Sequence, residues 1–377
     1  MLVKLALASV MSFCSMSIFS QTNKPYLLIG TYTSGKSEGI YVYNFNSITG
    51  ENSLVSTVKA SNPSYLAVSP NNNMVYAVTE DAAVTNKGTG GGVISFSFNK
   101  KNGTLTQINQ QFSGGKNPCY VAVDKSGKWV FAGNYSSGNA AVFAVKKDGS
   151  LDTLSTLIQH SGSGPNKDRQ TESHVHSTVI SPDNKFLFVP DLGIDKVMIY
   201  QFNDKNGKLI AANPAFAQSI PGSGPRHFDF HPTNKYAYLM EELTATVSAF
   251  KYSNGNLAPI QRISAMPTNF SGALGSADIH VSQDGHFLYC SNRGESNSIS
   301  IFKINAADGK LTMIRNQPSM GKTPRNFNFD PTGNFLLVAH QQSDEIVIFK
   351  IDKITGLLTD TGKRINVPNP VCIKWIK

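Results

Sequence analysis

Short apolar stretches alternate with short polar turns along the whole chain, and one such unit occurs seven times. Each copy has an apolar or aromatic stretch, a few polar residues, a glycine and soon afterwards a leucine. Their glycines are Gly50, Gly103, Gly149, Gly207, Gly255, Gly309 and Gly356. Glycine adopts positive φ without steric cost, so this pattern favours β-hairpin turns. The spacing of roughly 50 residues is typical of propeller blades with four strands.

A second hairpin turn occurs only six times, in segments such as VSPNNNMVYAV, ISPDNKFLFVP and FDPTGNFLLVA. The missing copy indicates how a ring would close. The segment KPYLLIGTYT resembles the second strand of a blade, whereas the final segment NPVCIKWIK resembles the blade openings NPSYLAVS and NPCYVAVD. We therefore expect the C-terminal strand to join the first blade as its innermost strand, which leaves no long open sheet edge.

These patterns predict an all-β chain forming one seven-bladed β-propeller over residues 21–377. The alternative is two smaller all-β domains, but no linker-like change in composition divides the chain. The longest glycine-rich insert, TNKGTGGG, lies within the predicted second blade. A sandwich or a barrel would not explain seven matched units.

The N-terminal segment MLVKLALASVMSFCSMSIFS has an early lysine, a short apolar run and small residues, which predicts a secretory signal peptide over residues 1–20. No other stretch approaches the length of a membrane span. The mature protein is therefore expected to be soluble and periplasmic or secreted. Its oligomeric state is left open.

Composition excludes several kinds of chemistry. The formal charge of +9 comes mostly from lysines scattered through turns, rather than from a basic patch with aromatic partners, so we expect no nucleic-acid binding. Three cysteines follow the signal segment, Cys119, Cys290 and Cys372, and each lies in an apolar stretch. We interpret them as buried, inert thiols.

In an antiparallel blade, the start of the first strand and the end of the second strand lie at the same end. The residues at these positions should therefore gather around one mouth of the channel. Those before the first strands include His174, His176, Arg226, His227, Asp278, Arg325 and Asn326. Those after the second strands include Glu80, Asn134, Tyr135, Asp191, Glu241, Glu242, Arg293 and His340. One rim thus collects arginine, histidine and carboxylate side chains.

The arginines are the most informative of these residues. The chain has only seven, none before Arg169, yet two stand directly ahead of strands in GPRHFDFHP and TPRNFNFDP. A guanidinium group matches a carboxylate or phosphate in a way that lysine does not. Arg226 and Arg325 therefore indicate an anionic ligand. A structural alternative is that they cross-link neighbouring blades.

At these residues the sequence resembles the lactonase family of seven-bladed propellers, which includes bacterial 6-phosphogluconolactonases and fungal carboxymuconate lactonizing enzymes. The resemblance covers nearly the whole mature chain. It is most specific in GPRHFDFHPTNKYAYLMEEL, HVHSTVISPDNKFLFVPDLG, YCSNRGES and TPRNFNFDPTGNFLLVAHQ.

The resemblance implies catalytic roles for His176, Arg226, Glu242 and Arg293. Many relatives have asparagine before the glutamate, where this chain has Glu241, so either acid is a candidate. For substrate binding we assign His174, Arg169, His227, Arg325 and Asn134. The loop GPNKDRQTESHVHS would bring Arg169 and Lys167 to the pocket edge, unless it is an ordinary exposed loop.

The chemistry expected is hydrolysis of a sugar-acid lactone by water. His176 or Glu242 would act as the base, and the arginines would stabilise the oxyanion or hold a carboxylate. The one stretch with GxSxG spacing, GKSEG at residues 35–39, stands between two strand-like segments rather than at a strand-to-helix elbow, so it does not support a serine nucleophile. The HVH pair alone does not make a metal site, so we expect no metal and no cofactor.

Two other functions are left open. A muconate-type lactonizing reaction would use the same acid–base group and arginines, and a secreted propeller that only binds a ligand would use the same rim. The ligand in each case is a small anionic molecule. An exported protein would not normally meet the phosphorylated pentose-pathway lactone, which is cytoplasmic, so an unphosphorylated lactone fits the predicted compartment better.

Overall fold

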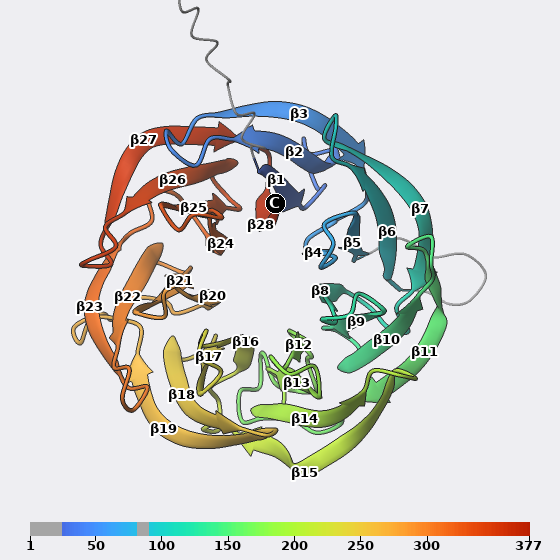
Figure 1. Cartoon of the computed structure of the whole chain (residues 1–377). Coiled ribbons are helices and arrows are strands. Elements are labelled where there is room, and N and C mark those ends of the chain that lie inside the picture. The colour runs from blue at the N-terminus through green and yellow to red at the C-terminus, as the bar shows by residue number, and fades with distance from the viewer. Residues whose placement is uncertain (1–24, 81–89) are drawn as a thin grey trace, which may run out of the picture.

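The structure is a computed structural model that describes residues 25–80 and 90–377. Seven four-stranded antiparallel sheets form a ring around a central channel (Figure 1). Within each blade the four strands lie side by side, in order from the channel to the rim of the disc. The described residues contain no helix, and so none that could cross a membrane. The predicted propeller is confirmed, whereas the predicted signal peptide lies outside the described residues.

The first three blades contain the N-terminal strands and the closing strand. The first blade consists of β28 (Pro370–Ile376), β1 (Tyr26–Thr31), β2 (Gly39–Phe45) and β3 (Asn52–Lys59). The second consists of β4 (Leu66–Val68), β5 (Met74–Thr79), β6 (Gly92–Asn99) and β7 (Thr104–Phe112). The third consists of β8 (Pro118–Val123), β9 (Trp129–Asn134), β10 (Asn139–Val145) and β11 (Leu151–Gln159).

The remaining four blades follow in chain order. The fourth consists of β12 (Val179–Ile180), β13 (Phe186–Asp191), β14 (Lys196–Asn203) and β15 (Lys208–Gln218). The fifth consists of β16 (Pro225–Phe230), β17 (Tyr236–Glu241), β18 (Thr246–Ser253) and β19 (Asn256–Ser264). The sixth consists of β20 (Ser276–Val281), β21 (Phe287–Asn292), β22 (Ser298–Ile304) and β23 (Leu311–Pro318). The seventh consists of β24 (Pro324–Phe329), β25 (Phe335–His340), β26 (Glu345–Ile351) and β27 (Leu358–Asn366).

The ring closes as the sequence predicts. β28 pairs with β1 in an antiparallel register that places Tyr26 opposite Ile376 and Ile29 opposite Ile373. The last strand is therefore the innermost strand of the first blade, and the first and last described strands lie in the same sheet (Figure 1). As a result β1, the second strand of the first blade, is paired on both sides, with β28 and with β2.

The seven repeated glycines do more than form turns. Each has positive φ, and an added methyl group would collide with the first residue of the second strand in a neighbouring blade at six of them and make a tight contact of 3.2 Å with that residue at Gly50. The pairs are Gly50 with Phe335, Gly103 with Tyr26, Gly149 with Met74, Gly207 with Trp129, Gly255 with Phe186, Gly309 with Tyr236 and Gly356 with Phe287. The repeat therefore joins each blade to the next.

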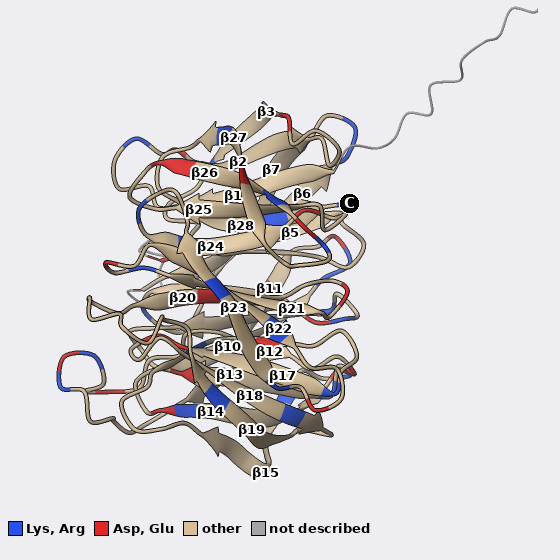
Figure 2. Cartoon of the chain, turned by 90° about the vertical axis from the view of Figure 1, so that its left-hand side faces the viewer, with Lys and Arg blue, Asp and Glu red and all other residues tan. Residues whose placement is uncertain are grey.

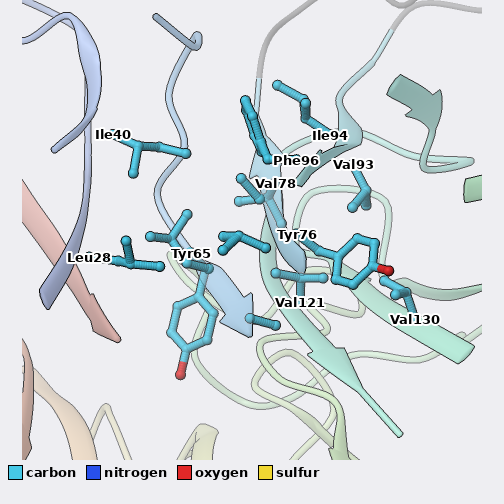
Figure 3. Close-up of a cluster of buried hydrophobic side chains, with 14 of the residues drawn as sticks. Leu28, Ile40, Tyr65, Tyr76, Val78, Val93, Ile94, Phe96, Val121 and Val130 are labelled. Carbon is cyan, nitrogen blue, oxygen red and sulfur yellow. The ribbon is translucent and has the colours of Figure 1, made fainter. Parts of the chain in front are cut away.

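Apolar side chains fill the space between blades rather than one central core. In the cluster shown in Figure 3, Leu28 and Ile40 of the first blade meet Phe96 and Val78 of the second and Val121 of the third. Similar clusters lie between the other blades. Lysines, arginines and acids are interspersed over the disc, with neither sign gathered into one region (Figure 2).

The register changes where the innermost strands begin. The pairing shifts between Pro118 and Tyr120, between Pro225 and His227, and between Pro324 and Asn326. Each shift leaves one extra residue in a β-bulge, and bulges often redirect a side chain next to an active site. The extra residues are Cys119, Arg226 and Arg325.

Candidate active site

Each blade has one residue at the sequence position of these bulges, and six of the seven, all but that of the sixth blade, border one space at the same mouth of the channel. In ring order these residues are Ser64, Cys119, His176, Arg226, Ala277, Arg325 and Val371. Above them lies a cavity of about 480 Å³. It is lined by Tyr32, Glu80, Asn117, Cys119, Tyr135, Ser136, Arg169, His176, Glu242, Arg293 and Arg325. The predicted gathering of arginine, histidine and carboxylate at one rim is thus present.

Glu242 is the central anion of this cavity. One carboxylate oxygen lies 2.8 Å from Arg169 Nη2, and the other lies 2.8 Å from Arg226 Nε and 3.0 Å from Arg293 Nη2. Burial alone would raise the pKa of Glu242, but the Arg293, Arg226 and Arg169 charges outweigh it and hold that pKa well below its usual value. Glu242 is therefore a stable carboxylate and a weak base.

The three arginines that hold Glu242 come from different blades. Arg226 is almost fully buried and also donates to the Ala277 carbonyl oxygen of the next blade. Arg293 donates to the carbonyl oxygens of Gly275 and Ser276, at 2.9 and 3.0 Å. Both therefore lock neighbouring backbone as well as Glu242. The cross-linking role left open from the sequence thus applies to them, in addition to any contact with a ligand.

Arg169 reaches the cavity from the loop before the fourth blade. Its Nη2 donates to Tyr135 Oη at 3.1 Å in addition to Glu242, and its side chain is 42% exposed. Gln170 anchors the loop by donating to Leu192 O and Asp195 Oδ1. Lys167, in the same loop, is exposed and does not line the cavity. The loop thus contributes one arginine to the mouth.

His176 faces Glu242 from the floor of the cavity. Its Nε2 lies 3.9 Å from a Glu242 oxygen, and its Nδ1 lies 3.7 Å from Cys119 Sγ. Burial, followed by the nearby Arg226 charge, lowers the pKa of His176 well below 6.5. The imidazole is therefore neutral at pH 7 and carries a free lone pair, while the same shift makes it a weaker base than an ordinary histidine.

Arg325 occupies the opposite side of the cavity. Its Nη2 donates to Tyr32 Oη at 3.0 Å, and its guanidinium lies 5.4 Å from the centre of the Tyr32 ring. Among the described residues, no carboxylate lies within ion-pair distance of Arg325. It therefore differs from the three arginines that share Glu242.

His227 lies one layer deeper in the channel than predicted. It does not line the cavity; its ring packs edge-on against Tyr65, Tyr120 and His176. Its Nδ1 lies 2.7 Å from Asp278 Oδ1. Burial, and then the Arg226 charge, lower the pKa of His227 to about 4, although Asp278 opposes the shift.

Two other predicted binding residues also lie off the cavity. His174 stacks on Tyr135, with 4.4 Å between ring centroids, and supports the cavity wall from behind. Asn134 is fully buried and donates to Ser113 O and Asn139 Oδ1, so it joins neighbouring strands.

Of the two adjacent acids, Glu241 points away from the site. Its carboxylate pairs with Arg262, Nε to Oε2 at 2.7 Å, on the other side of the blade from the cavity. Glu242 alone of the two lines the cavity.

Sequence analysis missed several neutral residues of the lining. Tyr32, Asn117 and Ser136 belong to no motif of their own. Tyr32 directly follows β1, the second strand of the first blade, and so has the same position as the rim residues that follow the second strands of other blades. Cys119 lines the cavity, but burial raises the pKa of its thiol to about 12, which agrees with an inert thiol. In residues 25–80 and 90–377, no three His, Cys, Asp or Glu side chains are arranged to hold a metal ion.

Comparison with known proteins gives the same picture at the level of the whole chain. Residues 26–375 match the family described as "Lactonase, 7-bladed beta-propeller". The 6-phosphogluconolactonase of Bacillus subtilis is 38% identical, with 92% of this chain and 97% of that protein covered. The 6-phosphogluconolactonase of Formosa agariphila is 40% identical, with 88% and 94% covered.

A solved structure extends the similarity to three dimensions. The periplasmic gluconolactonase of Pseudomonas aeruginosa superposes with a TM-score of 0.89 at 37% identity, covering 94% of this chain and 99% of that chain. The family match and these relatives both span nearly the full propeller. The chain therefore belongs to the lactonase family of seven-bladed β-propellers.

Proposed function

We propose that this protein hydrolyses the lactone of a sugar acid in the cavity around Glu242. The observation that carries the proposal is a neutral histidine, His176, facing a buried cavity with excess positive charge. Three arginines line the cavity and the buried Arg226 lies behind Glu242; against the two glutamates, Glu80 and Glu242, these four leave a formal charge of +2. Such a cavity favours the oxyanion that forms when water attacks a carbonyl.

His176 is the better candidate for the base. It is neutral at pH 7 and its Nε2 faces the cavity, whereas Glu242 is held as a carboxylate by three arginines. In this mechanism His176 takes a proton from the attacking water. Glu242 instead fixes the positions of Arg169 and Arg293, whose guanidinium groups border the space for the oxyanion.

Arg325 supports a second anionic contact. An oxyanion uses one of the two excess positive charges, and Arg325, with no ion-pair partner among the described residues, supplies the other. A phosphate or carboxylate remote from the lactone carbonyl would fit there. The hydroxy-acid product of an uncharged lactone would use the same arginines through its new carboxylate.

The compartment favours an unphosphorylated lactone. The predicted signal peptide and the periplasmic location of the Pseudomonas relative both support export. We infer a periplasmic protein that acts on a lactone of the gluconolactone type. The names of the Bacillus and Formosa relatives instead support the phosphorylated substrate.

The test measures hydrolysis of gluconolactone and 6-phosphogluconolactone in parallel, with spontaneous ring opening subtracted. Arg293→Gln should lose most of the activity, because its guanidinium borders the oxyanion. Arg262→Gln is the matched control, since Arg262 pairs with Glu241 outside the cavity. Rates at background for both lactones would contradict the proposal, and lactone formation from a muconate would then favour the cyclising reaction.

A further inference from the structure

Below the cavity lies a smaller pocket of about 10 Å³, close to the space that one water molecule needs. Cys119, His176 and Arg325 line both spaces, so the two adjoin at these residues. His227 also lines the smaller pocket. The two imidazoles therefore border the same water-sized space, with 5.4 Å between their ring centroids.

The hydrogen bond to Asp278 sets the proton positions of His227. Asp278 is a buried carboxylate, because the His280 and His227 interactions outweigh burial and hold its pKa well below the usual value. At 2.7 Å it accepts the Nδ1 proton of His227, which leaves the lone pair on Nε2. Among the described residues, His227 Nε2 has no hydrogen-bond partner. This is how a carboxylate orients a histidine for proton transfer.

Ionisable groups continue from this pair along the channel wall. The other oxygen of Asp278 lies 3.1 Å from His280 Nε2, and His280 Nδ1 lies 3.8 Å from Asp229 Oδ2. The side chains of His280 and Asp229 are 22% and 33% exposed. Asp278 also accepts hydrogen bonds from the Asn326 side chain and the Phe327 amide. A connected path thus leads from the buried pair to solvent.

Lactone hydrolysis produces a proton that such a path could carry to solvent. At neutral pH the product acid ionises, so each turnover releases one proton. That proton arises beside Arg226 and Arg325, whose charges disfavour keeping it on His176. Asp278, which is bonded to His227, provides a buried compensating carboxylate that is not shared among the three arginines of Glu242.

We propose that His227 and Asp278 form a relay that carries the proton of the hydrolysis reaction from His176 toward solvent. The inference rests on the proposed lactonase function. As the oxygen of the attacking water bonds to the carbonyl carbon, one of its O–H bonds breaks and its proton passes to His176 Nε2. The carbonyl electron pair moves to the oxyanion.

The second half of the transfer makes His176 neutral again but with its proton on Nε2, and exchange with the waters on its two sides returns the proton to Nδ1 before the next turnover. His176 gives its Nδ1 proton to a water in the small pocket, and that water gives a proton to His227 Nε2. Asp278 balances the new positive charge on His227. Collapse of the oxyanion breaks the ring C–O bond, and the departing alkoxide takes a proton from solvent. The net products are the hydroxycarboxylate and one proton.

The experiment compares the steady-state kinetics of the protein with those of His227→Gln and His227→Ala. Glutamine keeps a donor for Asp278 but does not carry a proton. We expect kcat to fall by roughly 10²-fold in both variants, with KM within about threefold of the original value. Imidazole in the buffer should restore part of the kcat of His227→Ala, whereas its non-basic isostere pyrazole should not.

His286→Gln is the matched control, because His286 is exposed on the opposite face beside Asp284. It should retain full activity. An unchanged kcat in His227→Gln, or equal rescue of His227→Ala by pyrazole, would overturn the relay while leaving the lactonase proposal standing. Absence of turnover in the unmodified protein would overturn both. If His227→Ala is unfolded by circular dichroism, the kcat of His227→Gln decides the matter.

Discussion

The two faces of the propeller use the same sevenfold repeat in different ways. On the face with the third-to-fourth strand turns, every blade keeps a glycine, and each glycine contacts the same strand position in a neighbouring blade. On the opposite rim, the bulged position differs in nearly every blade, from Val371 and Ala277 to His176 and two arginines. The constant positions build the ring, and the variable positions supply the chemistry.

The rim itself contains an instructive pair. Arg226 and Arg325 occupy equivalent bulges in GPRHFDFHP and TPRNFNFDP. Arg226 is buried and tied to Glu242 and to the Ala277 carbonyl. Among the described residues, the one side-chain hydrogen bond of Arg325 goes to Tyr32, and the charge of Glu80 also stabilises the Arg325 guanidinium. Equivalent positions in the repeat thus separate into a structural cation and a cation available to a ligand.

The largest effect is expected at the rim, from Glu242→Gln. Removing this carboxylate leaves three arginines without their shared anion, and breaking a buried ion pair typically costs about 3–5 kcal/mol. We expect a comparable fall in the free energy of unfolding in urea and loss of nearly all lactonase activity. Stability and activity close to those of the unmodified protein would show that the arginines do not depend on Glu242.

The pH dependence of stability should distinguish buried histidines whose pKa values are shifted in opposite directions. Burial, as the largest cause, lowers the pKa of His227 and of His340 to about 4, so the stability that each contributes is full above pH 6.5 and lost as pH falls toward 4. For His227 the shift corresponds to about 3 kcal/mol. Asp278 instead raises the pKa of His280 to about 9, against the effect of burial, so its contribution is lost as pH rises from 6.5 to 9.

Thermal unfolding should therefore show a maximum Tm near pH 6.5–7. His340→Phe removes one group that resists protonation and should flatten the acid side of this profile. A Tm that does not change between pH 6.5 and 4.5 would contradict the assignment of His227 and His340 as histidines that stay neutral in the folded protein.

On the turn face, the expected effect is on stability alone. Gly207→Ala places a methyl group 2.2 Å from Trp129 at positive φ, and overpacking of this kind costs about 1–3 kcal/mol. Gly362→Ala is the control, because Gly362 also has positive φ but no atom lies within 4 Å of the new methyl group. Urea unfolding should show the larger loss for Gly207→Ala, with kcat unchanged in both. Equal losses would mean that contact between blades contributes nothing.

The smallest effect is expected from Arg325→Lys. Lysine keeps the charge but not the planar fork of donors, so KM for a phosphorylated or carboxylated lactone should rise about tenfold while kcat stays within a few-fold. The same change at Arg226 should instead lower stability, because Arg226 holds Glu242 and the Ala277 carbonyl. Identical behaviour of the two variants would remove the distinction between these arginines.

The repeat in the sequence was sufficient to predict the number of blades, the closing strand and the rim on which the charged residues meet. Strand ends are set by turn residues, and alternation then determines which residues share a face. The prediction was less accurate where the strand is irregular. His174 and His176 were expected to share a face, but β12 begins only at Val179, and His174 stacks behind Tyr135.

The finer properties of the site depend on burial and on partners from other blades. Asn134 has the position of a rim residue, yet its side chain donates to Ser113 O, just after the last strand of the second blade, and to Asn139 Oδ1 within the third blade. Glu242 and His176 were equal candidates for the base until three arginines were found around Glu242. No local sequence pattern reports such long-range contacts.

The central claim is that His176 acts as the base of a lactonase, and it is tested most directly by the kcat of His176→Gln for gluconolactone. Glutamine preserves the size and polarity of the side chain but accepts no proton from water. The account predicts turnover by the unmodified protein well above spontaneous opening and a loss of kcat by roughly 10²–10⁴-fold in the variant. Turnover in His176→Gln equal to that of the unmodified protein would contradict it.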